Sequence, residues 1–210
     1  SDRNAVVKHL GEAPLDCLVN NAGFALFGAL ENTTEEQLRR QYDVNMIAPA
    51  LLTRDLLPAL RRARGTVINV SSMMSFFAMP LSSAYCSSKA GLTMLSESLR
   101  HELEPHGVRV VVVEPGGFRT KFGANIQWAT GAVPAYQRWT EGFRALRDKI
   151  SSGEGKSPQP VVDRIIRMAN SSKPGLRQRV GQDAFMTALF QALVPESVRI
   201  FLFRRVFKKL

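Results

Sequence analysis

Short apolar runs recur along the chain and are separated by longer stretches with helical spacing of apolar residues. Three of these runs, Leu15–Asn20, Thr66–Val70 and Val108–Glu114, have the length of strands. The last two are rich in Val and Ile, which is typical of parallel strands buried on both faces. A fourth run, Leu176–Gly181, predicts one more strand near the end of the chain.

Two helical patterns lie between the first three strands. The first begins at Thr33 or Thr34, where a hydroxyl can cap a first turn that carries acidic residues. Pro49 lies within this pattern and is expected to kink or divide the helix. The second runs from about Ser83 to Glu104 and ends at a Pro-His-Gly breaker. Strands and helices in this order predict right-handed crossovers and a parallel α/β sheet.

The pattern weakens after the third strand. Residues 120–157 are rich in aromatic residues, glycine and charge, and a helix at Pro160–Ala169 and a helical stretch from Asp183 follow. With 210 residues the chain is long enough for one sizeable core and too short to require two. We therefore expect a single domain over residues 1–210.

The composition narrows the class of protein. With 45% hydrophobic and 22% charged residues, the chain has the make-up of an ordinary globular protein. No apolar stretch reaches the roughly 18 residues of a membrane span, and the polar opening residues lack the core of a signal peptide. Cys17 and Cys86 have no metal-ligand spacing around them, so we expect a cytoplasmic protein without a metal.

The net charge of +10 is concentrated near the end of the chain. From Tyr136 onward, fifteen basic residues accompany six acidic ones. A phosphorylated cofactor, an acidic substrate or a membrane surface would each be attracted by such a surplus. Nucleic-acid motifs are absent from the sequence, so we expect no nucleic-acid partner. Apolar and basic residues alternate at about 196–210, which indicates a membrane-surface helix or one that docks on the domain or a second subunit.

Tyr85 and Lys89 are the first candidates for chemistry. They lie four residues apart near the start of the second helix, so the phenol and the ammonium share one helix face. A free tyrosine has a pKa near 10, and a nearby cation would lower it by ~2–3 units, towards the range of acid–base catalysis at neutral pH. Taken alone, this spacing is common on helices and proves little.

Small or polar residues follow each of the first three strands. Asn20 to Gly23 end the first strand, Ser72 follows the second, and Pro115-Gly116 end the third. In open α/β sheets, ligands bind beyond the carboxyl ends of the strands. Ser72 could donate a hydrogen bond to a substrate oxygen there, while glycine lets a backbone approach a ligand closely.

These residues together resemble the short-chain dehydrogenase/reductase family. The resemblance rests on Asn-Asn-Ala-Gly at 20–23, Asn45, Ser72, the Tyr85-x-x-x-Lys89 pair and Pro115-Gly-x-x-x-Thr120, in matching order and spacing. It covers nearly the whole chain. It implies a Rossmann-like, doubly wound sheet, with a substrate lid at about 120–157 and a basic C-terminal helix at about 196–210.

The resemblance also implies roles for individual residues. Tyr85 would exchange a proton with the substrate oxygen, Lys89 would lower its pKa and hold the nicotinamide ribose, and Ser72 would orient the substrate. Asn45 would bind a water that connects Lys89 to solvent. The residues that would contact NADP or NAD are Asp2, Asn20, Ala22, Gly23, Tyr85, Lys89, Pro115, Gly116, Phe118 and Thr120.

The chain departs from the family at two places. The glycine-rich turn that receives the cofactor pyrophosphate is absent, together with the first strands, which implies a fragment of a longer enzyme and leaves NAD versus NADP undecided. Leu15–Asn20 would then form a bare apolar edge of the sheet. Ser75 stands where the family often has glycine, which could alter the loop after Ser72.

The sequence thus predicts an oxidoreductase that interconverts a carbonyl and a secondary alcohol. Apolar residues near Ser72 favour a lipophilic substrate such as a steroid, a retinoid or an acyl chain. The resemblance further implies a homodimer or homotetramer, and peripheral membrane contact through the C-terminal helix is a second interpretation of the basic end. The alternative function is a catalytically silent interaction module on a truncated scaffold.

Overall fold

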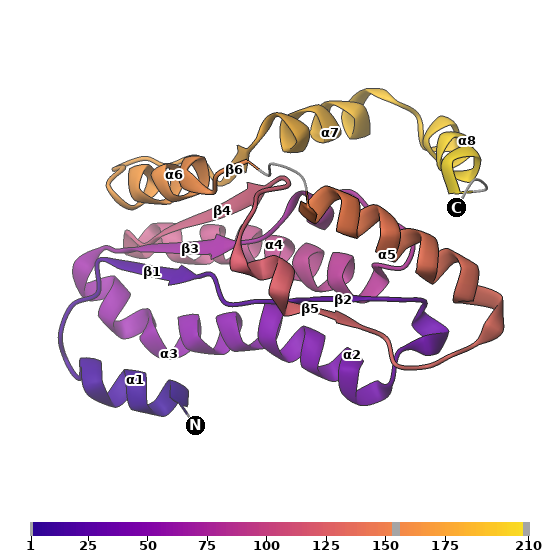
Figure 1. The fold of residues 1–210 in the computed structure, drawn as a ribbon. Coiled ribbons are helices and arrows are strands. Elements are labelled where there is room, and N and C mark those ends of the chain that lie inside the picture. The colour runs from indigo at the N-terminus through magenta and orange to yellow at the C-terminus, as the bar shows by residue number, and fades with distance from the viewer. Residues whose placement is uncertain (1, 153–155, 208–210) are drawn as a thin grey trace.

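The computed structural model describes residues 2–152 and 156–207, which form a parallel sheet between layers of helices (Figure 1). The strands are β1 (Cys17–Asn20), β2 (Ala25–Phe27), β3 (Thr66–Val70), β4 (Arg109–Pro115), β5 (Ile126–Trp128) and β6 (Arg177–Val180). The α-helices are α1 (Asp2–Leu10), α2 (Glu35–Tyr42), α3 (Ala48–Ala63), α4 (Ser83–Leu103), α5 (Gln137–Ser152), α6 (Gln159–Ala169), α7 (Gln182–Leu193) and α8 (Glu196–Phe207). A π-helix at Asp43–Ile47 joins α2 to α3.

Four parallel strands form the main sheet in the order β1-β3-β4-β6. Ile68 of β3 lies opposite Val19 of β1 on one side and Val111 of β4 on the other. All four predicted strands are present within two residues of their expected bounds. The predicted Rossmann-like α/β class is therefore confirmed.

Helices cover both faces of this sheet. On one face, Leu60 of α3 packs with Val67 and Val110 from β3 and β4, and α1 and α4 complete that layer. On the other face, Met168 of α6 packs against Ile68 and Val113. Figure 1 shows α6 above the strands and α3 below them. Burial on both sides explains why β3 and β4 are continuous Val and Ile runs.

The strand β1 forms one edge of the sheet, because β3 is the strand with which it pairs. Its Val19 side chain is 40% exposed. Among the described residues, the bare apolar edge expected from the sequence is thus present. Such an edge is available for pairing with a further strand.

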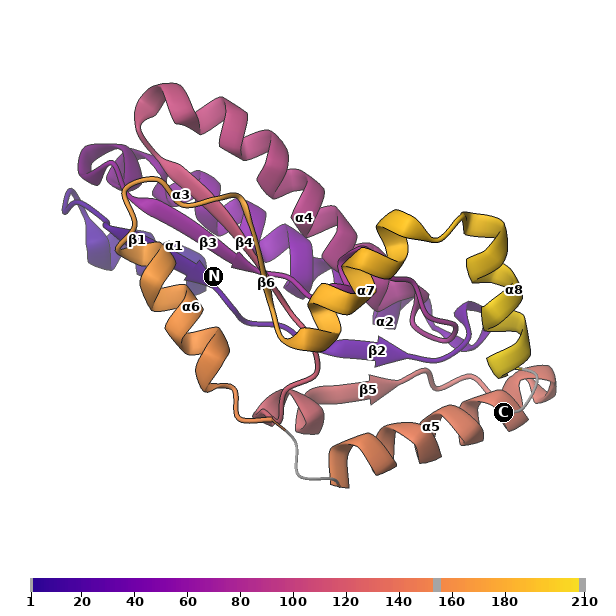
Figure 2. The ribbon, with the colours of Figure 1, turned by 90° about the horizontal axis from the view of Figure 1, so that it is seen from above.

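A second, smaller unit flanks the carboxyl edge of the main sheet. The strands β2 and β5 pair in parallel, and Figure 2 shows them beside α5. Phe143 of α5 is fully buried against Phe27 of β2 and Trp128 of β5, with ring centroids 5.4 and 6.1 Å apart. The sequence pattern did not predict this unit, because its order comes from aromatic packing between distant segments.

The start of α2 and the division after it follow from local chemistry. The Thr34 hydroxyl accepts from the backbone N–H of Gln37, whose side chain accepts from the N–H of Thr34 in return. Thr34, and not Thr33, is thus the N-cap. Pro49 lies in the first turn of α3, just after the π-helix, where its missing N–H costs little. The backbone stays helical through Pro49, and the change in helix type lies just before it, in the π-helix.

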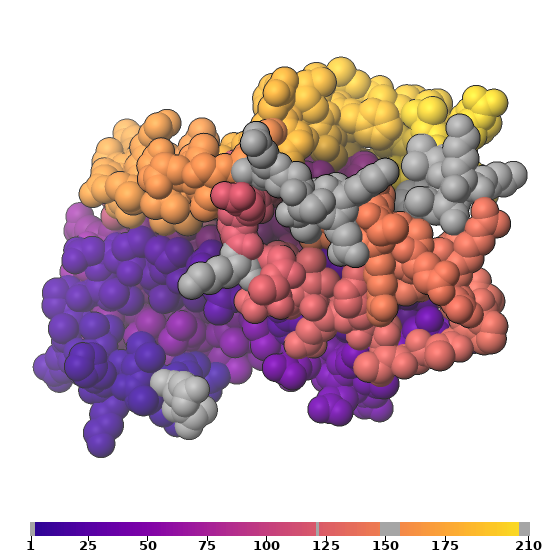
Figure 3. Space-filling model, viewed as in Figure 1, coloured from indigo at the N-terminus to yellow at the C-terminus, as the bar shows by residue number. Residues whose placement is uncertain are grey.

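The helices α7 and α8 run along the upper edge of the molecule (Figure 3). They expose several large apolar side chains, Phe185, Met186, Leu189, Leu193, Val198, Ile200, Phe201 and Leu202. The predicted C-terminal helix is present over the described part of 196–210, as α8. Within the ranges that the structure describes, none of the helices has the length and apolar character of a membrane span.

Candidate active site

Ser72, Tyr85 and Lys89 meet beyond the carboxyl end of β3. Ser72 caps a short 3₁₀ helix, Met73–Ser75, by accepting a 3.1 Å hydrogen bond from the backbone N–H of Met74. The Ser72 hydroxyl also lies near the Tyr85 phenol and lowers its pKa. Tyr85 lies in the first turn of α4 and Lys89 in the next, so both side chains point towards this strand end.

The Lys89 ammonium group is held in the interior. Its side chain is almost fully buried, and Nζ donates a 2.8 Å hydrogen bond to the carbonyl of Val70, the last residue of β3. Burial lowers the pKa of Lys89 to about 8, because the charged form loses its hydration. Lys89 thus keeps most of its positive charge at neutral pH. It lies close to the start of the segment between β3 and α4, residues 71–82, which we call the Ser72 loop.

The Tyr85 phenol is 5% exposed and lies among aromatic rings. Its ring contacts Phe27 edge-on at 6.1 Å and Phe122 at 5.9 Å. Burial raises the pKa of Tyr85 to about 12, while the Ser72 hydrogen bond and the positive charge of Arg147 act in the opposite direction. The pKa therefore moves upward, contrary to the lowering by Lys89 that the sequence led us to expect. Desolvation by the aromatic cover outweighs the charges around the phenol.

Asn45 and Gly23 complete the surroundings of Lys89. Asn45 lies in the π-helix, fully buried, and its amide donates to the Phe24 carbonyl at 3.0 Å and to Ser88 Oγ at 3.2 Å. A Cβ atom on Gly23 would lie 3.0 Å from Asn45 Oδ1 and 3.5 Å from Lys89 Nζ. The structure therefore brings Gly23, Asn45 and Lys89 together, and the water relay through Asn45 stays a prediction.

The Asn20 side chain is buried and hydrogen-bonded within the protein, so it does not face a ligand site. Its amide nitrogen donates to Asn69 Oδ1 at 2.7 Å and to Thr53 Oγ1 at 3.1 Å, and Asn69 in turn donates to Ser96 Oγ at 2.8 Å. This buried network ties β1 and β3 to α3 and α4. Ala22, by contrast, is exposed beyond β1, where contact with a cofactor remains a prediction.

The turn after β4 is fixed by Asp183, a residue that the sequence analysis treated as a helix start. Asp183 Oδ2 accepts a 2.6 Å hydrogen bond from the backbone N–H of Gly117. Its carboxyl group packs so closely on Gly116 that a Cβ there would overlap it. Gly116 is thus required by this close approach. In the sequence, the available signal was an acidic residue placed two positions after Gly181, the glycine that directly follows β6.

The other residues expected in this turn serve local packing. Pro115 ends β4. Phe118 packs in the core under α6, and Thr120 caps the next 3₁₀ helix by accepting from the N–H of Phe122 at 3.1 Å. Their contacts with a cofactor stay predictions. The side chain of Asp2 lies outside the described residues, although its backbone begins α1.

Glu114 is a fully buried carboxylate beside the Ser72 loop. Its Oε1 lies 3.2 Å from Arg177 Nη1, and its Oε2 lies 3.4 Å from Arg179 Nε. Ser75 Oγ donates to Glu114 at 3.4 Å, so the serine that departs from the family pattern ties its loop to β4. Burial raises the pKa of Glu114, although Arg177, Arg179 and Ser75 all oppose that change. Within the described ranges, no cluster of side chains could hold a metal ion.

Comparison with known proteins identifies the family of the chain. A family model described as short chain dehydrogenase matches residues 3–130. The chain therefore belongs to the short-chain dehydrogenase family.

Two curated relatives show how much of a family member the chain represents. It is 35% identical over 196 residues to the oxidoreductase YusZ of Bacillus subtilis, which covers 88% of the chain and 68% of that protein. It is 46% identical over 177 residues to the mitochondrial D-beta-hydroxybutyrate dehydrogenase of Bos taurus, covering 76% of the chain and 51% of that protein. The chain thus spans from half to two thirds of the length of these relatives.

Solved structures of short-chain dehydrogenases also superimpose on this chain. A short-chain dehydrogenase from Streptomyces avermitilis superimposes with a TM-score of 0.80 at 32% identity, over 99% of this chain and 76% of the other. A second, from Burkholderia cenocepacia in complex with NADP, has a TM-score of 0.73 at 25% identity, over 95% of this chain and 74% of the other.

Proposed function

We propose that this chain carries the catalytic centre of an oxidoreductase that interconverts a carbonyl and a secondary alcohol with NADP or NAD. One observation carries the proposal: Ser72, Tyr85 and Lys89 converge beyond the carboxyl end of β3, under an aromatic cover. In sheets of this class, that edge is where ligands bind.

Tyr85 is proposed as the group that exchanges the proton. With its pKa raised to about 12, the phenol is protonated at neutral pH and can donate to a substrate oxygen that gains negative charge. Ser72 would donate a second hydrogen bond to the same oxygen and orient it. In the oxidation direction, the phenol would first have to lose its proton, and it would then accept the proton of the substrate hydroxyl.

The residues around Lys89 fit the nicotinamide end of the cofactor. Gly23 leaves room beside the Lys89 ammonium, because a side chain there would approach both Asn45 and Lys89. Lys89 would donate to the ribose hydroxyls, and the bound cofactor would supply the hydride. A cavity of about 320 Å³ opens beside Gly23. Its lining consists of Gly23, Phe24, Arg40, Val44 and residues 124–127.

A lipophilic substrate is supported by the cover of Tyr85. Phe27, Phe122, Trp128 and Phe143 surround the phenol with apolar surface, together with methionines of the Ser72 loop. Two relatives bear the names retinol dehydrogenase and D-beta-hydroxybutyrate dehydrogenase, which favours a retinoid or an acyl substrate. Because Tyr85 is buried, we take the α5 segment as a lid that opens to admit the substrate.

The proposal includes three further properties. The unpaired thiols of Cys17 and Cys86 support a reducing, cytoplasmic compartment. The apolar residues exposed on α7 and α8 support a homodimer or homotetramer, or contact with a membrane surface through α8. Single-domain organisation over residues 1–210 is supported by the main sheet, whose strands come from residues 17 to 180.

The proposal is tested by expressing the complete reading frame and measuring oxidation of NADPH and NADH with retinal, 3-oxo acids and steroid ketones. Tyr85→Phe keeps the aromatic packing and removes the phenol hydroxyl, so we expect a rate loss of about 10²- to 10⁴-fold with unchanged cofactor binding. Tyr42→Phe is the matched control, because Tyr42 bonds Ser87 on the outer surface of α4.

Two results would contradict the proposal. Cofactor bound without oxidation in the presence of any carbonyl would indicate the silent interaction module. Equal rates for Tyr85→Phe and the unaltered protein would mean that another group transfers the proton.

A further inference from the structure

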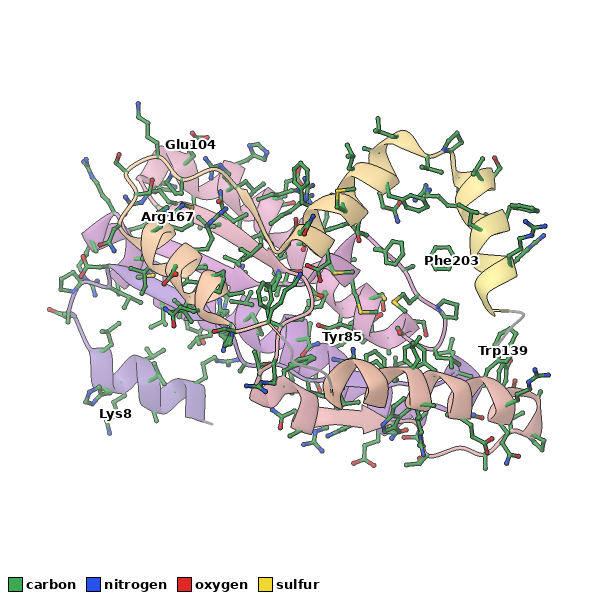
Figure 4. All side chains as sticks on the ribbon, turned by 45° about the horizontal axis from the view of Figure 1, so that its top comes forward. Lys8, Tyr85, Glu104, Trp139, Arg167 and Phe203 are labelled. Carbon is green, nitrogen blue, oxygen red and sulfur yellow. The ribbon has the colours of Figure 1, made fainter. Side chains whose placement is uncertain are left out.

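Three consecutive residues at the end of β3 each meet the helix that carries Tyr85 and Lys89. Val70 accepts from the Lys89 ammonium at 2.8 Å, and the Ser72 hydroxyl lies near the Tyr85 phenol. Ser71, between them, has no role in the proposed reaction. In Figure 4, the end of α4 that carries Tyr85 lies towards the middle of the molecule, where these contacts are made.

The Ser71 side chain is buried and hydrogen-bonded to α4 at two points. Its hydroxyl donates a 3.2 Å hydrogen bond to the backbone carbonyl of Lys89, and it lies 2.8 Å from Thr93 Oγ1, one turn further along. Because a hydroxyl has one proton, the Thr93 hydroxyl donates to Ser71 while Ser71 donates to Lys89. The backbone N–H of Ser71 also donates to the Val113 carbonyl of β4 at 2.8 Å. Ser71 thus ties the turn of α4 at Lys89 to two neighbouring strands.

Lys89 is therefore held at both ends of the residue. Val70 binds its ammonium group, and Ser71 binds its backbone carbonyl. The lysine stem has several rotatable bonds, so the bond to Val70 alone would let the helix backbone shift while the ammonium stayed in place. The bond from Ser71 removes that freedom. Because Tyr85 lies one turn before Lys89 on the same face, the same bond also sets the position of the phenol relative to Ser72.

A second serine connects α4 with β3 farther from the proposed site. Ser96 accepts a 2.8 Å hydrogen bond from the side-chain amide of Asn69 in β3, and it donates to the carbonyl of Leu92 at 2.6 Å. Like Ser71, it is buried. Ser96 lies about two turns beyond Lys89, so its hydroxyl stabilises the same pair of elements without touching the turn that carries the ammonium. The two serines therefore separate the anchoring of α4 as a whole from the anchoring of Lys89.

We infer that Ser71 is a positioning residue for the proposed reaction, and that it acts through Lys89. It holds this turn of α4 against the end of β3, so that the ammonium and the phenol one turn earlier stay aligned with Ser72. The inference rests on the proposed function and adds a residue to its site. Because catalysis depends on the distances between reacting groups, a displacement of this turn should lower the rate more than the binding of substrate.

The first test measures turnover of a carbonyl substrate with NADPH, with the protein expressed from its complete reading frame. Ser71→Ala removes the bond to the Lys89 carbonyl and should lower kcat by roughly 5- to 20-fold, while KM for the carbonyl changes by less than about twofold. Ser71→Thr keeps a hydroxyl at this place and should retain kcat to within about threefold. A role confined to packing would not distinguish these two variants by their hydroxyl.

The second test follows Lys89 itself and does not depend on turnover. Trace acetic anhydride acetylates amines, and mass spectrometry gives the modification of Lys89 relative to the exposed Lys173 in the same sample. Ser71→Ala should raise this ratio at least about fivefold, because the released turn lets the ammonium reach solvent. Ser96→Ala is the matched control. It should lower the urea unfolding midpoint about as much as Ser71→Ala and change kcat and the labelling ratio by less than about twofold.

Three results would overturn the inference. Equal effects of Ser71→Ala and Ser96→Ala would mean that Ser71 only stabilises the fold. A selective rise in Lys89 labelling without a loss of kcat in an active enzyme would show that the alignment is not needed for the reaction. A loss of kcat without a change in labelling would show that Ser71 does not act through Lys89. If the unaltered protein had no turnover with any carbonyl, selective labelling in Ser71→Ala would support the anchoring of Lys89 while the proposed function was rejected.

Discussion

The Lys89 ammonium donates a 2.8 Å hydrogen bond to the carbonyl of Val70, so a buried cation binds the last residue of β3. Burial lowers the pKa of Lys89 to about 8, from 10.5 in an exposed chain. Between these values the unfolded chain holds the proton and the folded chain releases it. The contribution of Lys89 to stability therefore rises as the pH increases from about 8 to about 10.5.

Lys89→Met should consequently stabilise the fold at pH 7. The shift of about 2.5 units corresponds to at most ~3 kcal/mol, and loss of the bond to Val70 offsets ~1 kcal/mol of it. We expect the variant to be about 1–2 kcal/mol more stable at pH 7, and this advantage to disappear by pH 10. Urea unfolding at several pH values measures it, with the exposed Lys173→Met as control. A gain that does not vary with pH would contradict the burial of a charged Lys89.

Tyr85 should remain protonated well into the alkaline range. Its pKa of about 12 implies that about one molecule in a hundred carries tyrosinate at pH 10. The near-ultraviolet tyrosinate absorbance of the unaltered protein minus that of Tyr85→Phe isolates this group. Arg147→Gln should move the ionisation to still higher pH, because it removes a cation that lowers the pKa of Tyr85. A midpoint near or below pH 9 would instead support the lowering by Lys89 expected from the sequence.

Several parts of the fold were predictable because their causes are local. The strands β3 and β4 are buried on both faces and therefore consist of Val and Ile. The end of α4 follows from the Pro-His-Gly breaker, where Gly107 adopts a left-handed conformation with φ of 73°. Tyr85 and Lys89 could be placed on one face from their spacing alone.

The remainder depends on contacts between segments far apart in the chain. Helix α5 contains Gly142 and a mixture of charged and aromatic residues, and its inner face is defined by Phe143 meeting Phe27. The direction of the Tyr85 pKa depends on that same cover, which the sequence pattern does not contain. The carboxyl group of Asp183 reaches Gly117 across sixty-six positions of sequence, so the sequence around Asp183 could not indicate this partner.

Because Asp183 contacts the turn after β4, substitutions of Gly116 and Asp183 should have non-additive effects on the free energy of unfolding. Gly116→Ala would push a methyl group into the Asp183 carboxyl and should destabilise the fold by about 1–3 kcal/mol. Asp183→Ala should cost about 1–2 kcal/mol by removing the partner of the Gly117 N–H. Together they should cost at least ~1 kcal/mol less than the sum, because the second change removes the collision.

Urea unfolding of the four proteins of this cycle gives the coupling energy. Gly123→Ala is the control, since a Cβ there would meet nothing within 4 Å, and its stability should change by less than ~0.5 kcal/mol. Strict additivity of the Gly116 and Asp183 changes would show that the turn does not need this contact.

Glu114 and Arg177 form a pair whose contribution to stability should depend on pH. The pKa of Glu114 is raised from 4.5 by burial, and Arg177 is the first of the charges that restrain this rise. A carboxyl group with a raised pKa contributes stability below pH 4.5 that is lost as the pH rises through its folded value. Arg177→Gln removes the restraint and raises the pKa further. The variant should thus lose about 1–3 kcal/mol at pH 7 and much less at pH 4.5.

Unfolding midpoints in urea at both pH values measure this difference. Glu114→Gln in the Arg177→Gln background should recover most of the loss at pH 7, because the uncompensated buried charge is then absent. Glu97→Gln serves as control: it removes the other carboxylate bound to Arg177, at 2.7 Å, whose side chain is 39% exposed, and it should change stability by less than ~1 kcal/mol. If Arg177→Gln lost the same stability at both pH values, or if Glu114→Gln gave no recovery, the Arg177 side chain would act by packing and not by compensating the charge of Glu114.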